Sequence, residues 1–132
     1  MRITADTNVL VRAITGDDAQ QSPIAQNALA DADAVAVTLP TLCEFVWVLR
    51  RGYRVSTADI AEAIRRLIGG GNVLADRPAI EAGLSALDAD GDFADAVIAY
   101  EGRWLGAEIF ASFDVKAVSM LRDQGEKAVA LG

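Results

Sequence analysis

Carboxylates dominate the side chains that could do chemistry in this sequence. The 132 residues contain no histidine, which excludes a Ser-His-Asp triad, a Cys-His pair and a histidine-based zinc site. The single cysteine, Cys43, lies in an apolar segment and is expected to be a small buried hydrophobe. Acid–base or metal chemistry must therefore use carboxylates, lysine, tyrosine or water.

Two aspartates follow short apolar segments that have the pattern of β-strands. Asp6 comes directly after RITA, and Asp114 ends the sequence IFASFD. In an open parallel sheet the ligand site lies at the carboxyl ends of the strands. We therefore expect Asp6 and Asp114 to lie at the same edge of a sheet, as neighbours.

Three further acids occupy unusual helical positions. Glu44 interrupts the apolar sequence LPTLCEFVWVLRR, where its neighbours one turn away are mostly apolar. Asp92 and Asp95, in GDFADAVIAY, are one turn apart near the start of a predicted helix. The partial positive charge at a helix start favours anions.

Each acid also has a structural interpretation. Asp6, Asp92 with Asp95, and Asp114 could cap the helices that follow them. Glu44 could face solvent, as a glutamate in a helix usually does. Taken singly, none of these acids favours chemistry over its structural role.

As a set, Asp6, Glu44, Asp95 and Asp114 can converge, with Asp92 at the margin. Two carboxylates ~4 Å apart repel by roughly 4 kcal/mol at an effective dielectric constant near 20. Such a cluster must take up protons or hold a cation. Because oxygen ligands select Mg²⁺ or Mn²⁺ over zinc, the implied chemistry is attack of a metal-activated water on a phosphodiester.

Short strands and helices of about ten residues alternate along the whole chain, which predicts an α/β fold with a mostly parallel sheet flanked by helices. The predicted strands are 2–5, 35–38, 72–75, 109–113 and 128–131, and the predicted helices are 9–15, 22–32, 40–51, 56–68, 78–87, 93–103 and 116–122. Ser22 and Ser56 are expected to cap their helices.

The length suits a single domain over residues 1–132. No apolar run approaches the ~18 residues that a membrane span needs, and the lone cysteine fits a cytoplasmic setting. The net charge of −7 argues against a polyanionic partner. With the five candidate acids assigned to a metal site, however, the remainder of the chain carries only −2.

The sequence resembles a PIN-domain nuclease, and more narrowly the VapC-type toxin of a bacterial type II toxin–antitoxin pair. The resemblance is carried by ADTNVLVR, LCEFVWVL, DFADAVIA and SFD, which follow the family's order from residue 5 to residue 114. It implies a PIN-like three-layer sandwich and an endoribonuclease that uses Mg²⁺ or Mn²⁺. It also implies a homodimer and inhibition by a cognate antitoxin.

The resemblance assigns roles to individual residues. The family has three core acids, which correspond here to Asp6, Glu44 and Asp95. Its fourth acid corresponds to Asp114, and an accessory acid corresponds to Asp92. Asn8 matches the asparagine of the first motif and is expected to hold the Asp6 carboxylate. Ser112 could orient either a metal-bound water or Asp114.

Two other functions fit part of this pattern. A PIN nuclease that acts in RNA processing, rather than as a toxin, would share the acids. A receiver-type signalling domain would also bind Mg²⁺ at strand ends. That domain needs an adjacent acidic pair and a lysine at a strand end, whereas Asp6 is single and Lys116 lies beyond the strand.

The surface residues leave alternatives open. Arg50 and Arg51, at the end of the helix that holds Glu44, could contact RNA phosphates or belong to a solvated helix face. The aromatic residues Trp47, Tyr53 and Trp104 are expected in the core by default. A dimer or antitoxin surface is the alternative for them.

Overall fold

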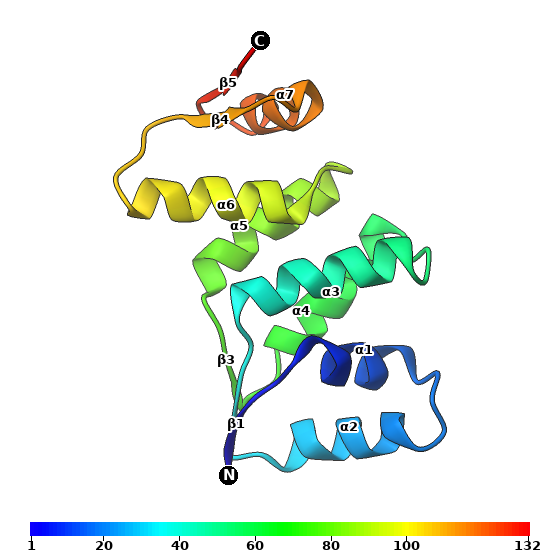
Figure 1. Cartoon of the computed structure of the whole chain (residues 1–132). Helices are drawn as coiled ribbons and strands as arrows, with labels where there is room; N and C mark the ends of the chain where they lie inside the picture. Colours follow the sequence, from blue (N-terminus) through cyan, green and yellow to red (C-terminus); the bar gives the residue numbers. More distant parts are fainter. The chain divides into compact units, whose positions relative to one another are not determined.

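The computed structural model describes all 132 residues and divides them into two compact units, Met1–Asp76 and Arg77–Gly132. Strands and helices alternate in both units (Figure 1). The expectation of a single domain over 1–132 stays a prediction. None of the helices combines the length and the hydrophobicity that a membrane span requires.

The first unit contains a three-stranded parallel sheet in the order β1-β2-β3. Its register places Ile3 opposite Val35, and Val35 opposite Val73. Its strands are β1 Arg2–Thr4, β2 Ala34–Ala36 and β3 Val73–Leu74, and its helices are α1 Thr7–Thr15, α2 Gln21–Asp31, α3 Leu39–Arg51 and α4 Thr57–Ile68. Helix α1 packs against both α2 and α3, so the helix that follows the first strand has a neighbour on either side.

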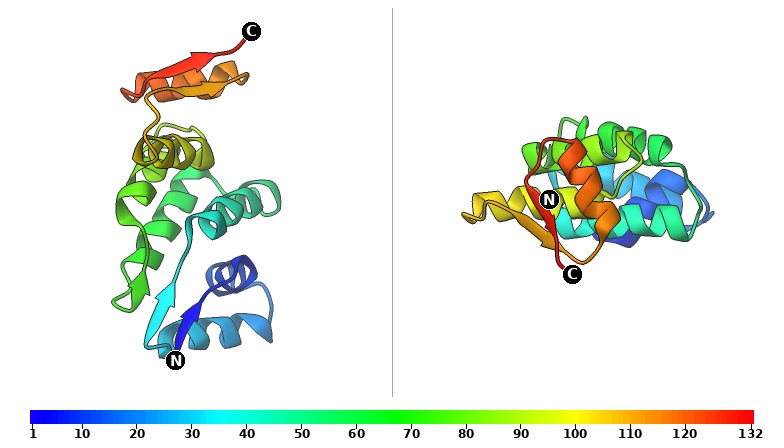
Figure 2. Two further views of the ribbon diagram at one scale, coloured as in Figure 1. Left: turned by 60° about the vertical axis from the view of Figure 1, so that its left-hand side comes forward. Right: turned by 90° about the horizontal axis from the view of Figure 1, so that it is seen from above.

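The second unit pairs two parallel strands, β4 Phe110–Ser112 and β5 Ala128–Ala130. Figure 2 shows β1 beside β2, and β4 beside β5, within their respective units. The helices are α5 Arg77–Asp88, α6 Phe93–Trp104 and α7 Val115–Asp123. A small core of Ala86, Ala96, Ala99, Val118, Leu121 and Ala128 joins them. Helix α5 packs directly against α6, and α7 packs against β4 and β5.

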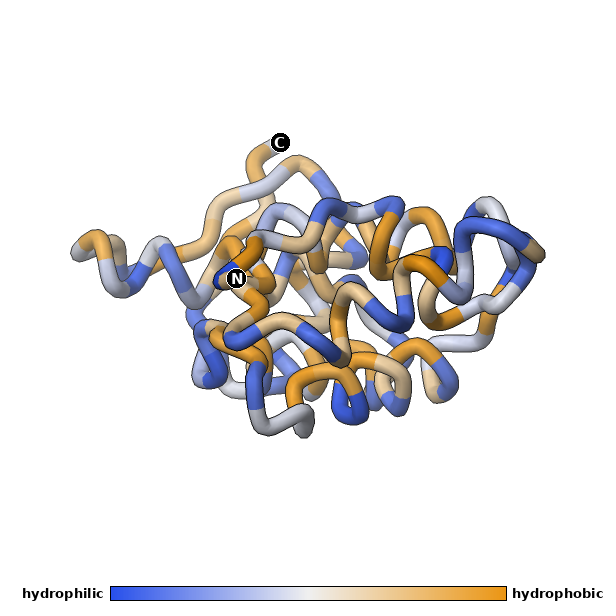
Figure 3. The backbone as a smooth tube through the Cα atoms, turned by 90° about the horizontal axis from the view of Figure 1, so that it is seen from below, coloured by the Kyte–Doolittle hydropathy of each residue, from blue (hydrophilic) through white to orange (hydrophobic).

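The five strands and seven helices predicted from the sequence are all present, and the α/β class with parallel strands is confirmed. Polar and apolar residues alternate along the helical turns (Figure 3), which is the pattern on which the helix predictions depended. The cap at Ser56 is also confirmed, because its side chain accepts a hydrogen bond from the Asp59 N–H at 3.2 Å.

The prediction that Ser22 caps α2 is wrong. The helix begins one residue earlier, and the Asp18 carboxylate accepts hydrogen bonds from the N–H groups of Gln20 and Gln21, at 2.9 and 2.7 Å. Ser22 instead accepts a bond from the Asp18 N–H and is buried. A carboxylate that reaches two free amides at once satisfies more of the helix start than a single hydroxyl can.

Candidate functional site

Asp6 lies where β1 ends and α1 begins. Its Oδ1 accepts a hydrogen bond from the Thr7 N–H at 2.8 Å, so the capping role is present. Ala5 and Thr7 are buried while Asp6 is exposed. The alternation of buried and exposed residues at this junction therefore turns the carboxylate out of the core, and the cap holds it there.

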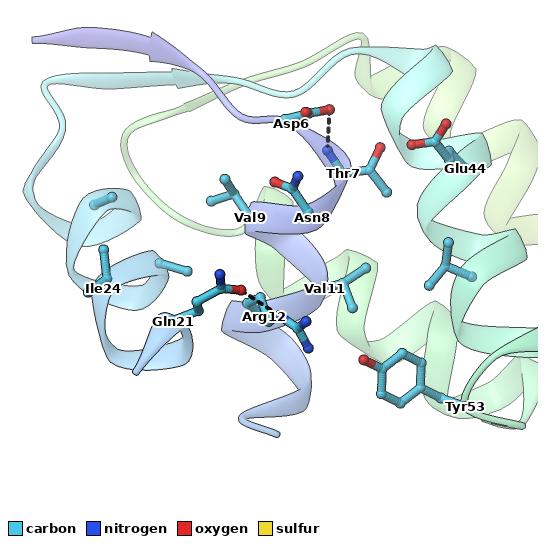
Figure 4. Close-up of a pocket in the computed structure, with 13 residues that line it drawn as sticks. Asp6, Thr7, Asn8, Val9, Val11, Arg12, Gln21, Ile24, Glu44 and Tyr53 are labelled. Atoms are coloured by element: carbon cyan, nitrogen blue, oxygen red, sulfur yellow. Dashed lines mark hydrogen bonds between the residues drawn. The ribbon is translucent and has the colours of Figure 1, made fainter. Parts of the chain in front are cut away.

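Asp6 and Glu44 line the same pocket of the first unit, which has a volume of about 810 Å³ (Figure 4). Glu44 projects from α3, whose neighbouring Leu42 and Phe45 are completely buried. Burial of those two side chains sets the rotation of α3, and this rotation leaves Glu44 exposed beside the pocket. Two of the predicted acids are thus brought together.

The interaction expected of Asn8 is absent. Asn8 lines the pocket with Asp6, but the hydrogen bond to the Asp6 carboxylate comes from the Thr7 backbone. Thr7 donates from the first turn of α1, where backbone N–H groups have no partner within the helix. The amide of Asn8 therefore remains available to a molecule in the pocket.

The other three acids all lie in the second unit, and two of them are helix caps. Asp92 begins α6 and accepts a hydrogen bond from the Asp95 N–H at 3.1 Å. Asp114 begins α7 and accepts from the N–H groups of Lys116 and Ala117, at 3.0 and 3.1 Å. Capping and membership of an acidic cluster are therefore compatible roles for these residues.

Ser112 holds the backbone that carries Asp114. Its Oγ accepts a hydrogen bond from the Asp114 N–H at 3.0 Å. Of the two roles considered for Ser112, this contact favours orientation of Asp114, by a bond to the backbone rather than to the carboxylate. Together with the helix cap, it restricts the directions that the Asp114 side chain can take.

Asp95 has the most perturbed carboxyl group of the second unit. Burial, followed by the charges of Asp92 and Asp114, raises its pKa from 3.8 to about 6. The side chain is half-buried at the first turn of α6. Because the charges of both neighbours also act on this carboxyl group, a positive charge beside it would be favourable.

The donor set fits a hard divalent cation. All five candidate side chains offer carboxylate oxygens, which suit Mg²⁺ and Mn²⁺, and the raised pKa of Asp95 indicates surroundings that disfavour further negative charge. Within neither unit does a group of three acidic, histidine or cysteine side chains lie close enough together to hold a metal ion. The predicted proximity of Asp6 to Asp114 stays a prediction.

The pocket also holds polar residues that no sequence pattern singled out. Arg12, Gln21 and Tyr53 come from α1, from α2 and from the segment after α3, and all three line the pocket. Asp17 joins them, because it accepts hydrogen bonds from the Tyr53 hydroxyl at 2.6 Å and from Arg12 at 3.1 Å. These contacts join residues up to 36 positions apart, beyond the reach of any local motif.

The surface predictions have mixed outcomes. Arg50 and Arg51 lie exposed in the last turn of α3, where they are accessible to a ligand. The default placement of Trp47 and Trp104 in the core is wrong, because 62% and 78% of these residues are exposed. Tyr53 also lies outside the core, with 37% exposed.

Comparison with known families identifies the fold. The PIN domain matches residues 3–119, a segment that includes all five candidate acids. No curated protein matches the chain. The PIN domain is a nuclease fold whose members usually depend on divalent metal ions such as Mg²⁺. Since the match covers nearly the whole sequence, the chain belongs to the PIN domain family.

Proposed function

We propose that this chain is a Mg²⁺- or Mn²⁺-dependent endoribonuclease and the toxin of a type II toxin–antitoxin module. The observation that carries the proposal is Asp95, whose pKa is raised to about 6 by burial and then by the charges of Asp92 and Asp114. A divalent cation would relieve the repulsion among these charges. Membership of a family of nucleases supplies the reaction class.

The metal-binding carboxylates are proposed to be Asp6, Glu44, Asp95 and Asp114, with Asp92 as an accessory ligand. When bound, the ion supplies Lewis acidity and a water of lowered pKa for attack on a phosphodiester. The chain's own contribution is orientation. The Thr7 N–H holds the Asp6 carboxylate, and the amides at the start of α7 hold that of Asp114.

Removal of divalent metal is expected to abolish RNA cleavage. Purified protein should lose activity in EDTA and regain it when Mg²⁺ or Mn²⁺ is added in excess. The Asp6→Asn variant should keep its fold, but its rate of RNA cleavage should fall at least roughly a hundredfold. This loss is larger than that expected when a residue outside the metal's own ligands is changed. Asp31→Asn, which changes an exposed acid of the same unit, is the matched control. Undiminished cleavage in EDTA would contradict the proposal.

Arg50 and Arg51 are proposed to contact RNA phosphates. The double change to glutamine should weaken RNA binding. A plot of the logarithm of the binding constant against the logarithm of salt concentration should also have a slope that is shallower by about 1.4, because each phosphate contact to a single strand contributes about 0.7. Arg66→Gln is the control, because Arg66 is exposed on α4 and pairs with Glu62. An unchanged slope in the double variant would refute the phosphate contacts.

The proposed partners are a second copy of the chain and a cognate antitoxin. The exposed side chains of Trp47, Trp104 and Leu105 are apolar surfaces that a partner could cover. An antitoxin with an arginine or lysine directed at the acids would complement their charge.

Light scattering tests the dimer directly, because a molecular mass equal to that of one chain at working concentration would exclude it. An antitoxin reading frame directly upstream distinguishes a toxin from a PIN nuclease of RNA processing.

A further inference from the structure

The pocket that contains Asp6 and Glu44 extends well beyond these acids. Arg12 lies six residues after Asp6 along α1, about 9 Å further along the helix, and Tyr53 lines the same pocket from the segment that follows α3 (Figure 4). The volume of about 810 Å³ falls within the range of pockets that hold small organic ligands. This second end of the pocket has no part in the proposed metal chemistry.

The Tyr53 ring is held in place although it is partly exposed. Its hydroxyl donates a 2.6 Å hydrogen bond to Asp17 Oδ2. Hydrogen bonds from Tyr53 and Thr15, with a smaller contribution from Arg12, lower the pKa of Asp17 to about 2, so this acceptor stays ionised at any working pH. An aromatic ring whose orientation is already set loses little conformational freedom when a flat ligand stacks on it.

The same network fixes two donor side chains that line the pocket, Arg12 and Gln21. Arg12 Nη1 donates to Asp17, and Arg12 Nε donates to Gln21 Oε1 at 2.9 Å. Arg12 Nη2 and Gln21 Nε2 make no hydrogen bond within the protein. A pocket that two fixed donor side chains and a fixed aromatic ring line together suits a flat group with acceptors along its edge.

We propose that Tyr53, Arg12 and Gln21 form a binding site for a nucleobase of the RNA strand, with Asp17 as the residue that positions them. The base stacks on Tyr53 and presents its acceptor edge to Arg12 and Gln21. Guanine, whose N7 and O6 are both acceptors, is the base that this donor pair suits best. This inference rests on the proposed nuclease function, because the same pocket would place the strand beside Asp6 and Glu44.

A protein segment is the competing occupant of the pocket, since Val9, Ile24 and Val48 also line it. An apolar side chain would gain nothing from a fixed pair of unpartnered donors, and it would bury them without hydrogen bonds. The polar network therefore favours the nucleotide.

The test measures binding of a labelled oligouridine that carries a single guanosine, by fluorescence anisotropy with Mg²⁺ present. Asp95→Asn serves as the background, so that the RNA stays intact. Tyr53→Ala is expected to weaken binding roughly tenfold, within the range for loss of one base–aromatic stack. Tyr53→Phe, which keeps the ring, should lose much less. Leu74→Ala is the control, because Leu74 is an exposed apolar residue of the same unit that does not line the pocket.

A second comparison changes the RNA as well as the protein. Replacing the single guanosine by uridine should weaken binding severalfold, and Arg12→Gln should remove this difference. Equal binding of the two oligonucleotides, equal effects of Tyr53→Ala and Leu74→Ala, or no binding at all would each overturn the base site. Absence of cleavage by the unmodified protein would instead count against the nuclease proposal, so the two failures can be told apart.

Discussion

Asp95→Asn is expected to abolish RNA cleavage and, at the same time, to make the protein more stable at neutral pH. Asp95 is a proposed metal ligand, so the rate of cleavage should fall at least roughly a hundredfold. The gain in stability has a separate cause. Burial, together with the charges of Asp92 and Asp114, raises the pKa of Asp95 to about 6, which means that the folded state disfavours this charge.

The size of the gain follows from that pKa. A rise from 3.8 to about 6 corresponds to at most about 3 kcal/mol. Screening by water at a half-buried side chain reduces this to about 1–2 kcal/mol, and loss of a favourable charge at the start of α6 removes about 0.5 kcal/mol more. Urea unfolding at pH 7.5 in EDTA should therefore show a net stabilisation of about 1 kcal/mol.

The pH dependence gives a second readout, and its sign is opposite to ordinary acid denaturation. Between pH 4 and pH 6 the folded state binds more protons at Asp95 than the unfolded state does, so the contribution of this group to the free energy of unfolding falls as pH rises. Asp95→Asn should lack that contribution. Glu101→Gln, an exposed acid of the same helix, should change stability by less than about 0.5 kcal/mol. A destabilised or fully active Asp95→Asn variant would contradict the assignment.

The fold was predictable because its local signals agree with one another. Apolar runs such as Ile3–Ala5 and Ile109–Ala111 mark strands, and the Ser56 hydroxyl marks a helix start that the structure confirms. The Ser22 prediction failed because Asp18 is close enough in the chain to compete for the same amides and accepts from two of them. The conformation of the turn decides which of two nearby polar residues caps a helix. This conformation cannot be predicted from the periodicity of apolar residues.

The candidate site was predictable in part. The acids could be recognised because strand ends and helix starts are positions where the chain must turn a polar group outward, and Asp6, Asp92 and Asp114 do cap helices there. The connection from Asp17 to Tyr53 could not be recognised, because it joins side chains from distant segments after α1 and α3 have packed together. Sequence patterns predict that a residue lies at a strand end or a helix start. The packing of the elements then decides which side chains come into contact.

Gly83→Ala is expected to lower the stability of the protein by overpacking the second unit. A Cβ at Gly83 would lie 2.4 Å from two ring carbons of Phe93, and Phe93 is almost completely buried. Overpacking of this kind costs about 1–3 kcal/mol. The higher helix propensity of alanine offsets up to about 1 kcal/mol of that cost, so urea unfolding should show a net loss of about 1 kcal/mol or more.

Gly102→Ala is the matched control, because Gly102 lies in α6 and a Cβ added there would have no heavy atom within 4 Å beyond its own helix backbone and chain neighbours. This change should stabilise the protein by up to about 1 kcal/mol, so the two glycine variants should differ by about 2 kcal/mol. Phe93 is the first residue of α6 and lies between Asp92 and Asp95, so its displacement by Gly83→Ala should also lower the rate of RNA cleavage. If Gly83→Ala matched Gly102→Ala in stability and activity, the close contact between α5 and α6 would have no role in placing the acids.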